Sequence, residues 1–288
     1  MSKTIFITGA SSGIGQKAAL LFQSNGWNVV ASMRSPEQDT VLSGLPNVIC
    51  PVLDVTDDAT IDTAVAEAIA RFGAIDVVLN NAGYGLIGAF ETFDKQQIER
   101  QFQTNVFGLM AVTRAVLPHF RQRGSGAFIN VTSFAGRSIF PMYSVYHASK
   151  WAVEGFCESL QYEVKEYNIR VKIIEPGIVK TAFWGRSTDR DNQSGIGAYE
   201  RYGQPILELI DNAAGIVGTQ PEDVADAIWQ ATNDNSSRLR YIVGLDAHVT
   251  LGLRRLLSDR SYTQVMKGVF SESSQRLFRG IVSRLSSS

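Results

Sequence analysis

Short apolar runs rich in β-branched residues alternate along this chain with longer segments whose apolar side chains recur at helical spacing. The segment Asp58–Phe72 is typical of the second kind, with apolar residues at positions 61, 65, 68, 69 and 72. The predicted strands are Ile5–Thr8, Val29–Ser32, Asn47–Leu53, Ile75–Leu79, Gly126–Thr132, Ile169–Glu175 and Leu239–Val243. The predicted helices are Ile14–Gln23, Asp58–Phe72, Asp94–Arg121, Val145–Tyr167 and Pro221–Thr232.

This alternation predicts an α/β fold, a doubly wound parallel sheet of about seven strands with helices on both faces. The strands are almost entirely apolar, as parallel strands buried on both faces should be. Residues 178–218 contain no clear strand and are rich in Gly, Ser, Asp and Asn, which is typical of a binding loop. We therefore expect a single domain over residues 1–248 with a substrate loop at 178–218, followed by a C-terminal helical extension over residues 249–288.

Composition and charge exclude several classes of protein. The chain has 288 residues, of which 44% are hydrophobic and 19% charged, so it is neither disordered nor a fibrous repeat. A net charge of −1 gives no indication of nucleic-acid binding. No apolar segment is long enough for a signal peptide or a membrane span, so a cytoplasmic location is expected. Cys50 and Cys157 are interpreted as buried apolar residues, and no metal-binding cluster is present.

The extension is basic, with seven Arg and Lys residues against two acids over residues 249–288. A basic amphipathic segment can lie on a membrane surface. Packing on its own domain, over the substrate cleft or in an oligomer surface, is favoured over membrane contact.

A glycine-rich turn, TGASSGIG at residues 8–15, lies between the first predicted strand and the first predicted helix. Glycines there let the backbone approach a pyrophosphate closely, and the helix N-terminus offers free N–H groups and the positive end of its dipole. Further motifs follow in order: NNAG at 80–83, Ser133, Y-x-x-x-K at Tyr146 and Lys150, and Pro176-Gly177.

Over about residues 3–245 the chain resembles the short-chain dehydrogenase/reductase family, whose coenzyme loop reads T-G-x-x-x-G-x-G. The resemblance implies a Rossmann-type, dinucleotide-binding catalytic domain. The stretch from Ser133 to Phe183 is similar to the branch that holds 17β-hydroxysteroid and retinol dehydrogenases and bacterial carbonyl reductases. The family resemblance also implies a homodimer or homotetramer assembled through the two long helices, 94–121 and 145–167.

The candidate catalytic residues are Ser133, Tyr146, Lys150 and Asn105. Tyr146 and Lys150 are four residues apart on a predicted helix and so share one face, where the ammonium is expected to lower the pKa of the phenol. This pair makes a general acid/base, and the Ser133 hydroxyl can polarise the same substrate oxygen. The resemblance gives Lys150 a second role at the nicotinamide ribose. It also interprets Asn105 as a helix distortion that holds a water between Lys150 and solvent.

The end of the second strand indicates NADP(H) in preference to NAD(H). Met33 occupies the position where an NAD site usually has an acid, and Arg34 follows it. A guanidinium binds a 2′-phosphate well. Because Ser12 supplies no second basic group, an NAD-dependent alcohol dehydrogenase stays an alternative. The predicted cofactor-binding residues are Thr8, Gly9, Ser11, Ser12, Gly13, Ile14, Gly15, Arg34, Asp54, Val55, Asn81, Ala82, Gly83, Tyr146, Lys150, Pro176, Gly177, Val179 and Thr181.

The predicted pocket wall is mostly apolar and aromatic, which suits a hydrophobic ketone or aldehyde or the matching secondary alcohol. Its residues are Tyr84, Leu86, Phe134, Tyr143, Phe183 and Trp184, any of which could instead belong to the core. His147 is expected to be structural. A non-catalytic NADP-binding regulator is a second alternative, disfavoured because the catalytic group is complete. A sugar-nucleotide epimerase or dehydratase of the extended family is disfavoured by the glycine spacing.

Overall fold

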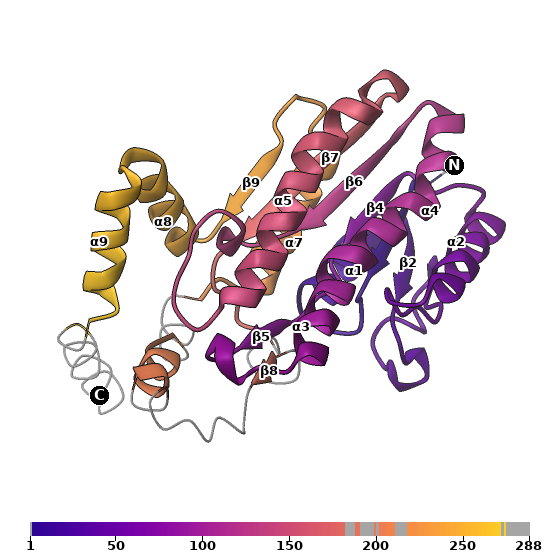
Figure 1. Ribbon diagram of the computed structural model, residues 1–288. Coiled ribbons are helices and arrows are strands. Elements are labelled where there is room, and N and C mark those ends of the chain that lie inside the picture. The colour runs from indigo at the N-terminus through magenta and orange to yellow at the C-terminus, as the bar shows by residue number, and fades with distance from the viewer. Residues whose placement is uncertain are drawn as a thin grey trace, which may run out of the picture.

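The computed structural model describes residues 2–181, 188–190, 199, 202–210, 218–271 and 274. Its centre is a parallel sheet of seven strands in the order β3-β2-β1-β4-β6-β7-β9 (Figure 1). The strands are β1 (Thr4–Thr8), β2 (Asn28–Ser32), β3 (Val48–Ile49), β4 (Val77–Asn80), β6 (Gly126–Val131), β7 (Ile169–Pro176) and β9 (Arg240–Val243). The expected Rossmann-type α/β fold is therefore confirmed.

Helices cover both faces of this sheet. One face packs against α1 (Gly13–Ser24) and α7 (Pro221–Asn233), and the other against α2 (Asp58–Phe72), α4 (Gly108–Arg123) and α5 (Ser144–Val164). Alternate side chains of each strand point to opposite faces, so that in β1 Ile5 and Ile7 join the first core and Phe6 the second. All three side chains are completely buried.

The chain reverses its direction across the sheet between β1 and β4. It runs from β1 outward to β3, returns to β4, and then continues outward to β9. Helices on the two sides diverge there, and a crevice is left at the carboxyl ends of these strands, where ligands of open α/β sheets bind.

Two predicted elements differ from the observed ones. The third strand pairs only over Val48–Ile49, with one further bridge at Val52, because Pro51 cannot donate to the ladder. The helix predicted from 94 to 121 is divided into α3 (Lys95–Phe102), a π-helical segment (Gln103–Phe107) and α4. The extra residue in the π turn is accommodated where Asn105 bonds to backbone outside the helix.

The structure adds elements that the sequence pattern did not reveal. Strands β5 (Gly85–Ile87) and β8 (Thr188–Arg190) form a small parallel pair, so part of the expected loop 178–218 is a strand. Residues 202–210 of that loop are helical. Short 3-10 turns occupy Pro36–Gln38, Phe90–Thr92, Phe134–Gly136 and Lys165–Tyr167.

The C-terminal segment forms α8 (Leu245–Leu256) and α9 (Asp259–Val269), which stand at one side of the sheet beyond β9 and α5 (Figure 1). Ala247 and Leu251 of α8 are buried against Phe134. The described part of the extension therefore packs on the rest of the chain through Leu251. Among the described residues, no helix combines the length and apolar character needed to span a bilayer.

Candidate active site

A cavity of about 1190 Å³ lies at the carboxyl ends of β1, β4, β6 and β7. It extends from the glycine loop, past the start of α5, to α8 and α9. The predicted cofactor residues that line it are Gly9, Ser11, Ser12, Gly13, Ile14, Arg34, Asp54, Val55, Asn81, Ala82, Gly83, Tyr146, Lys150, Pro176, Gly177, Val179 and Thr181. The fold has brought together residues that are far apart in the sequence.

The glycine loop is shaped by close contacts that exclude side chains. Gly9 and Gly13 have φ of +69° and +56°, a region that favours glycine. A Cβ on Gly15 would lie 2.4 Å from the carbonyl oxygen of Gly9 and 2.6 Å from Nδ2 of Asn81. The loop leads into α1, whose first turn contains no acidic residue. The cradle thus fits the phosphates of a dinucleotide.

Thr8 and Gly15, both predicted to bind cofactor, lie behind this surface and support it. Asn81 Nδ2 donates to the carbonyl oxygens of Thr8 and Gly9, each at 3.0 Å. The Thr8 hydroxyl accepts from the backbone N–H groups of Asn81 and Ala82, each at 3.1 Å. The segment after β4 therefore holds the end of β1 and the start of the glycine loop in place.

The end of β2 presents one basic group to the cavity. Met33 is buried, and Arg34 after it is exposed at the cavity lining. Asp54 lies nearby at the lining and accepts from the N–H and hydroxyl of Thr56 at 2.9 and 2.7 Å. A cation at this point suits a phosphate-bearing ribose.

Tyr146, Lys150 and Ser133 meet at the cavity wall. The Ser133 hydroxyl is hydrogen-bonded to the Tyr146 side chain, and Lys150 Nζ lies 5.8 Å from the Tyr146 ring centroid. Nζ donates to the carbonyl oxygen of Val131 at 3.1 Å. All three residues are buried, with less than a tenth of each exposed.

Burial decides the protonation of this group. Desolvation raises the pKa of Tyr146 to about 12 and outweighs the Ser133 hydrogen bond, which lowers it. Desolvation lowers the pKa of Lys150 to about 8, and the negative charge of Glu154 partly opposes this. The pKa of the phenol is therefore raised rather than lowered as expected, because desolvation is the largest contribution.

Asn105 lies behind the cavity, in the π-helical segment. Its side chain is buried and bonds to the backbone of Tyr84, and Nδ2 also donates to Ser149 Oγ at 3.3 Å. A Cβ on Gly83 would lie 3.1 Å from Asn105 Oδ1 and 3.8 Å from Lys150 Nζ. Asn105 thus connects the segment after β4 to the helix that carries Tyr146.

A buried ionic network beneath Lys150 was not found from the sequence. Glu154, one turn after Lys150, accepts from the Thr132 hydroxyl at 2.6 Å and from Arg240 Nε at 3.0 Å. Arg240 also pairs with Glu175, which is fully buried, at 3.3 Å. Burial, and then the charge of Glu175, raises the pKa of Glu154. These residues lie on separate elements, and no local spacing connects them.

The predicted pocket residues divide between the cavity and the core. Tyr84, Phe134 and Tyr143 line the cavity. Leu86 does not, since it is completely buried against Phe93. Phe183 and Trp184 lie outside the described residues.

His147 is structural, as expected. Its Nδ1 lies 2.8 Å from the Ala135 carbonyl oxygen, its Nε2 accepts from the Phe140 N–H, and burial lowers its pKa to about 4. The described residues contain no group of three or more side chains suited to a metal ion.

Comparisons of the sequence and of the structure with known proteins point to the same family. Residues 3–192 match the short chain dehydrogenase family. The uncharacterized oxidoreductase YusZ of Bacillus subtilis is 36% identical over 277 residues, covering 92% of this chain and 97% of that protein. A short-chain dehydrogenase structure from Streptomyces avermitilis is 33% identical with a TM-score of 0.78, covering 93% of this chain and 98% of its own. The structure of ElxO with NADP bound is 25% identical with a TM-score of 0.70, covering 86% of this chain and 98% of its own.

Proposed function

This chain belongs to the short-chain dehydrogenase family, and on that premise we propose that it is an NADP(H)-dependent oxidoreductase that reduces hydrophobic ketones or aldehydes. The observation that carries the proposal is the meeting of Ser133, Tyr146 and Lys150 in a cavity that begins at the glycine loop. Its lining near these groups is largely apolar, including Phe134, Phe140 and Tyr143, which supports a hydrophobic substrate.

The cofactor assignment rests on the residues around the first two strands. The glycine loop and the N-terminus of α1 would hold the pyrophosphate, and Arg34 would bind the 2′-phosphate. The bound NADP of ElxO supports the cofactor class, whereas the preference over NAD(H) rests on Arg34 and on the apolar Met33 before it. Asp54 would bond the adenine amine.

The catalytic group acts on the substrate oxygen. When bound, NADPH would supply the hydride for the carbonyl carbon. Ser133 donates a hydrogen bond to the carbonyl oxygen, and Tyr146 transfers its phenolic proton there as negative charge develops. Lys150 contributes positive charge beside the phenolate that remains, and Asn105 keeps the supporting backbone in position.

The protonation of Tyr146 affects the pH range in which each direction of the reaction is fast. A phenol whose pKa is about 12 keeps its proton near neutral pH and is ready to donate it. Oxidation of an alcohol would need the phenolate at the outset, which is scarce under those conditions. The raised pKa of Tyr146 therefore favours fast reduction at neutral pH and fast alcohol oxidation at higher pH, while the net direction follows the ratios of NADPH to NADP and of ketone to alcohol.

The test follows nicotinamide absorbance with NADPH and with NADH against aryl ketones, aldehydes and aliphatic ketones. NADPH consumption by wild type is expected to fall by a factor of about 10² to 10⁴ in Tyr146→Phe. Direct titration should show that Tyr146→Phe still binds NADPH, because the glycine loop and Arg34, which carry the proposed contacts to the pyrophosphate and the 2′-phosphate, are unchanged. Unchanged turnover in Tyr146→Phe would contradict the mechanism. NADPH binding without turnover of any carbonyl would favour the non-catalytic alternative.

We also propose self-association through α4 and α5. Trp151 and Tyr162 on α5 are 43% and 74% exposed, and Phe107 just before α4 is 52% exposed. Large aromatic groups are enriched at protein interfaces. Sedimentation of wild type and Trp151→Asp tests this, since the variant is expected to dissociate.

A further inference from the structure

Helix α9 turns one complete face to the cavity. The residues that line the cavity from α9 are Tyr262, Val265, Met266 and Val269, at the i, i+3, i+4 and i+7 positions of a single helix face. Along the helix axis this face spans roughly 10 Å. Tyr262 at its beginning is buried, whereas Val265 and Val269 remain 39% and 47% exposed.

Helix α8 presents a face with the same spacing. Asp246, Val249, Thr250 and Leu253 line the cavity, while Ala247 and Leu251 on the adjacent face are buried against the domain. Val249 and Leu253 are 53% and 39% exposed. The position of α8 is therefore fixed by its buried face, and within the described part of the chain Val249 and Leu253 on its cavity face stay partly exposed.

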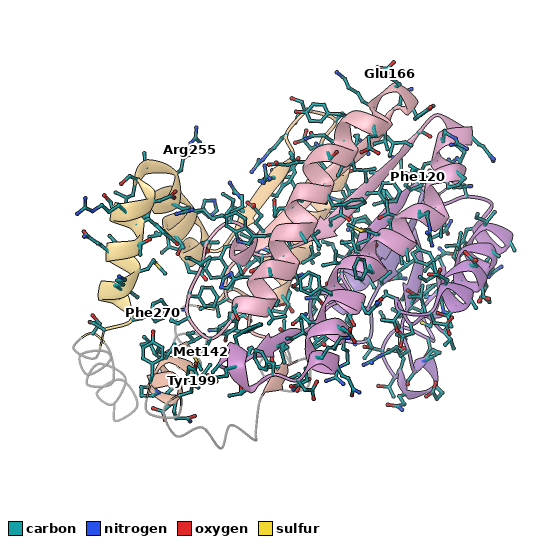
Figure 2. All side chains as sticks on the ribbon, viewed as in Figure 1. Phe120, Met142, Glu166, Tyr199, Arg255 and Phe270 are labelled. Carbon is teal, nitrogen blue, oxygen red and sulfur yellow. The ribbon has the colours of Figure 1, made fainter. Side chains whose placement is uncertain are left out.

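The two helices are held to each other and to the site. The Arg254 guanidinium lies 4.9 Å from the Tyr262 ring centroid and pairs with Asp259 at 2.9 Å. Phe270, just after α9, packs against the cluster that contains Tyr143 and Tyr146. Phe270, labelled at the C-terminal end of α9 in Figure 2, and Met142 both pack against this cluster.

The uncovered apolar faces belong to the same cavity as the catalytic group. Four partly exposed aliphatic side chains on two neighbouring helices are costly in water, at roughly 25 cal/mol per Å² of apolar surface. An apolar group placed over them from within the cavity would remove that cost. A compact substrate such as a small aryl ketone would occupy the region near Tyr146 without covering α9.

We propose that α8 and α9 form a binding wall for an extended hydrocarbon chain, and that the substrate is an aliphatic, lipid-like ketone whose carbonyl lies at Tyr146. This inference rests on the proposed function and adds the substrate class and the residues that select it. Val249, Leu253, Val265 and Val269 are the specificity-determining residues. The carbonyl chemistry stays with Ser133 and Tyr146.

The test compares methyl ketones of increasing chain length, from butanone through octanone to dodecanone. Because each buried methylene contributes about 0.8 kcal/mol, kcat/KM is expected to rise by up to about fourfold per added methylene. Val265→Asp and Leu253→Asp should lower kcat/KM for dodecanone at least tenfold and leave the value for butanone unchanged. Gln264→Asp, an exposed position of α9 with the same change in charge, should affect neither ketone.

A second readout is independent of turnover. Calorimetric titration of dodecanone into the protein should give binding that Val265→Asp weakens at least tenfold and Gln264→Asp leaves intact. Binding with this pattern but without reduction would support the chain-binding wall and refute the proposed reaction. Reduction of short ketones with no dependence on chain length would refute the wall and leave the reaction standing. A change in oligomeric state on Val265→Asp would also overturn the proposal, because the face would then be an interface between copies.

Discussion

The side-chain amide of Asn105 holds both backbone polar atoms of Tyr84. Oδ1 accepts from the Tyr84 N–H at 3.0 Å, and Nδ2 donates to the Tyr84 carbonyl oxygen at 2.9 Å. The two residues are 21 positions apart, and the bonds form because the π-helical segment directs Asn105 out of the regular helix. The segment that borders the cavity after β4 is therefore fixed by a side chain outside the cavity.

Replacing Asn105 by Ala should destabilise the fold and impair catalysis together. The substitution leaves the Tyr84 N–H without its partner, at a cost of about 1–3 kcal/mol, whereas the Tyr84 carbonyl oxygen keeps the bond from Gln101 Nε2 at 2.9 Å. Urea unfolding should report a decrease within that range, and kcat/KM should fall because Gly83 and Tyr84 lose their support. Retention of wild-type stability and activity would show that the backbone is held by other contacts.

Gly15→Ala should abolish cofactor binding or folding. Its Cβ would lie 2.4 Å from the Gly9 carbonyl oxygen, a contact that the loop can relieve only by moving. Gly268→Ala is the matched control, since a Cβ there meets nothing within 4 Å on the exposed face of α9. The control should gain about 0.5–1 kcal/mol from helix propensity. Calorimetric titration with NADPH and thermal melting of both variants check these outcomes.

Arg34→Asp should shift the cofactor preference from NADPH toward NADH. Loss of a charge-assisted hydrogen bond costs about 1.5–3 kcal/mol, which is roughly a tenfold to hundredfold rise in KM for NADPH. The new acid can bond the ribose hydroxyls of NADH. Arg121→Asp, with the same charge change at an exposed position of α4, should leave the ratio of the two kcat/KM values unchanged. A ratio unchanged in Arg34→Asp would contradict the assignment.

The cost of burying Lys150, measured in the free energy of unfolding, should decrease as the pH rises. The pKa of this amine is about 8 in the fold and about 10.4 when unfolded. Between these values the unfolded chain binds more protons, so the free energy of unfolding rises with pH. Below about pH 8 the fold carries the full cost of burying the cation, about 3 kcal/mol.

Lys150→Met removes that cost. The variant should therefore be more stable than wild type near neutral pH, and the difference should shrink as the pH rises from about 8 toward about 10. Urea unfolding of both proteins across this range measures the difference, in which other titrating groups largely cancel. A difference that stays constant with pH would mean that Lys150 titrates in the fold as it does in water.

Local features of the sequence were sufficient to predict the fold and many of the residues of the candidate active site. The period of apolar residues predicted the sheet and its helices, because backbone hydrogen bonding imposes that period on any buried face. The spacing of Tyr146 and Lys150 placed them one turn apart, since four residues nearly complete a helical turn. The glycine loop was recognisable from its position between a strand and a helix.

Tertiary packing decided the features that depend on residues distant in the sequence. Asn105 meets Tyr84, and Arg240 reaches Glu154 across 86 positions, only because separate elements pack together. Leu86 belongs to the core rather than the cavity for the same reason. The raised pKa of Tyr146 and the use of α8 and α9 as a cavity wall follow from burial. Burial is a property of the whole fold, whereas the sequence pattern reports only which face of each element is apolar.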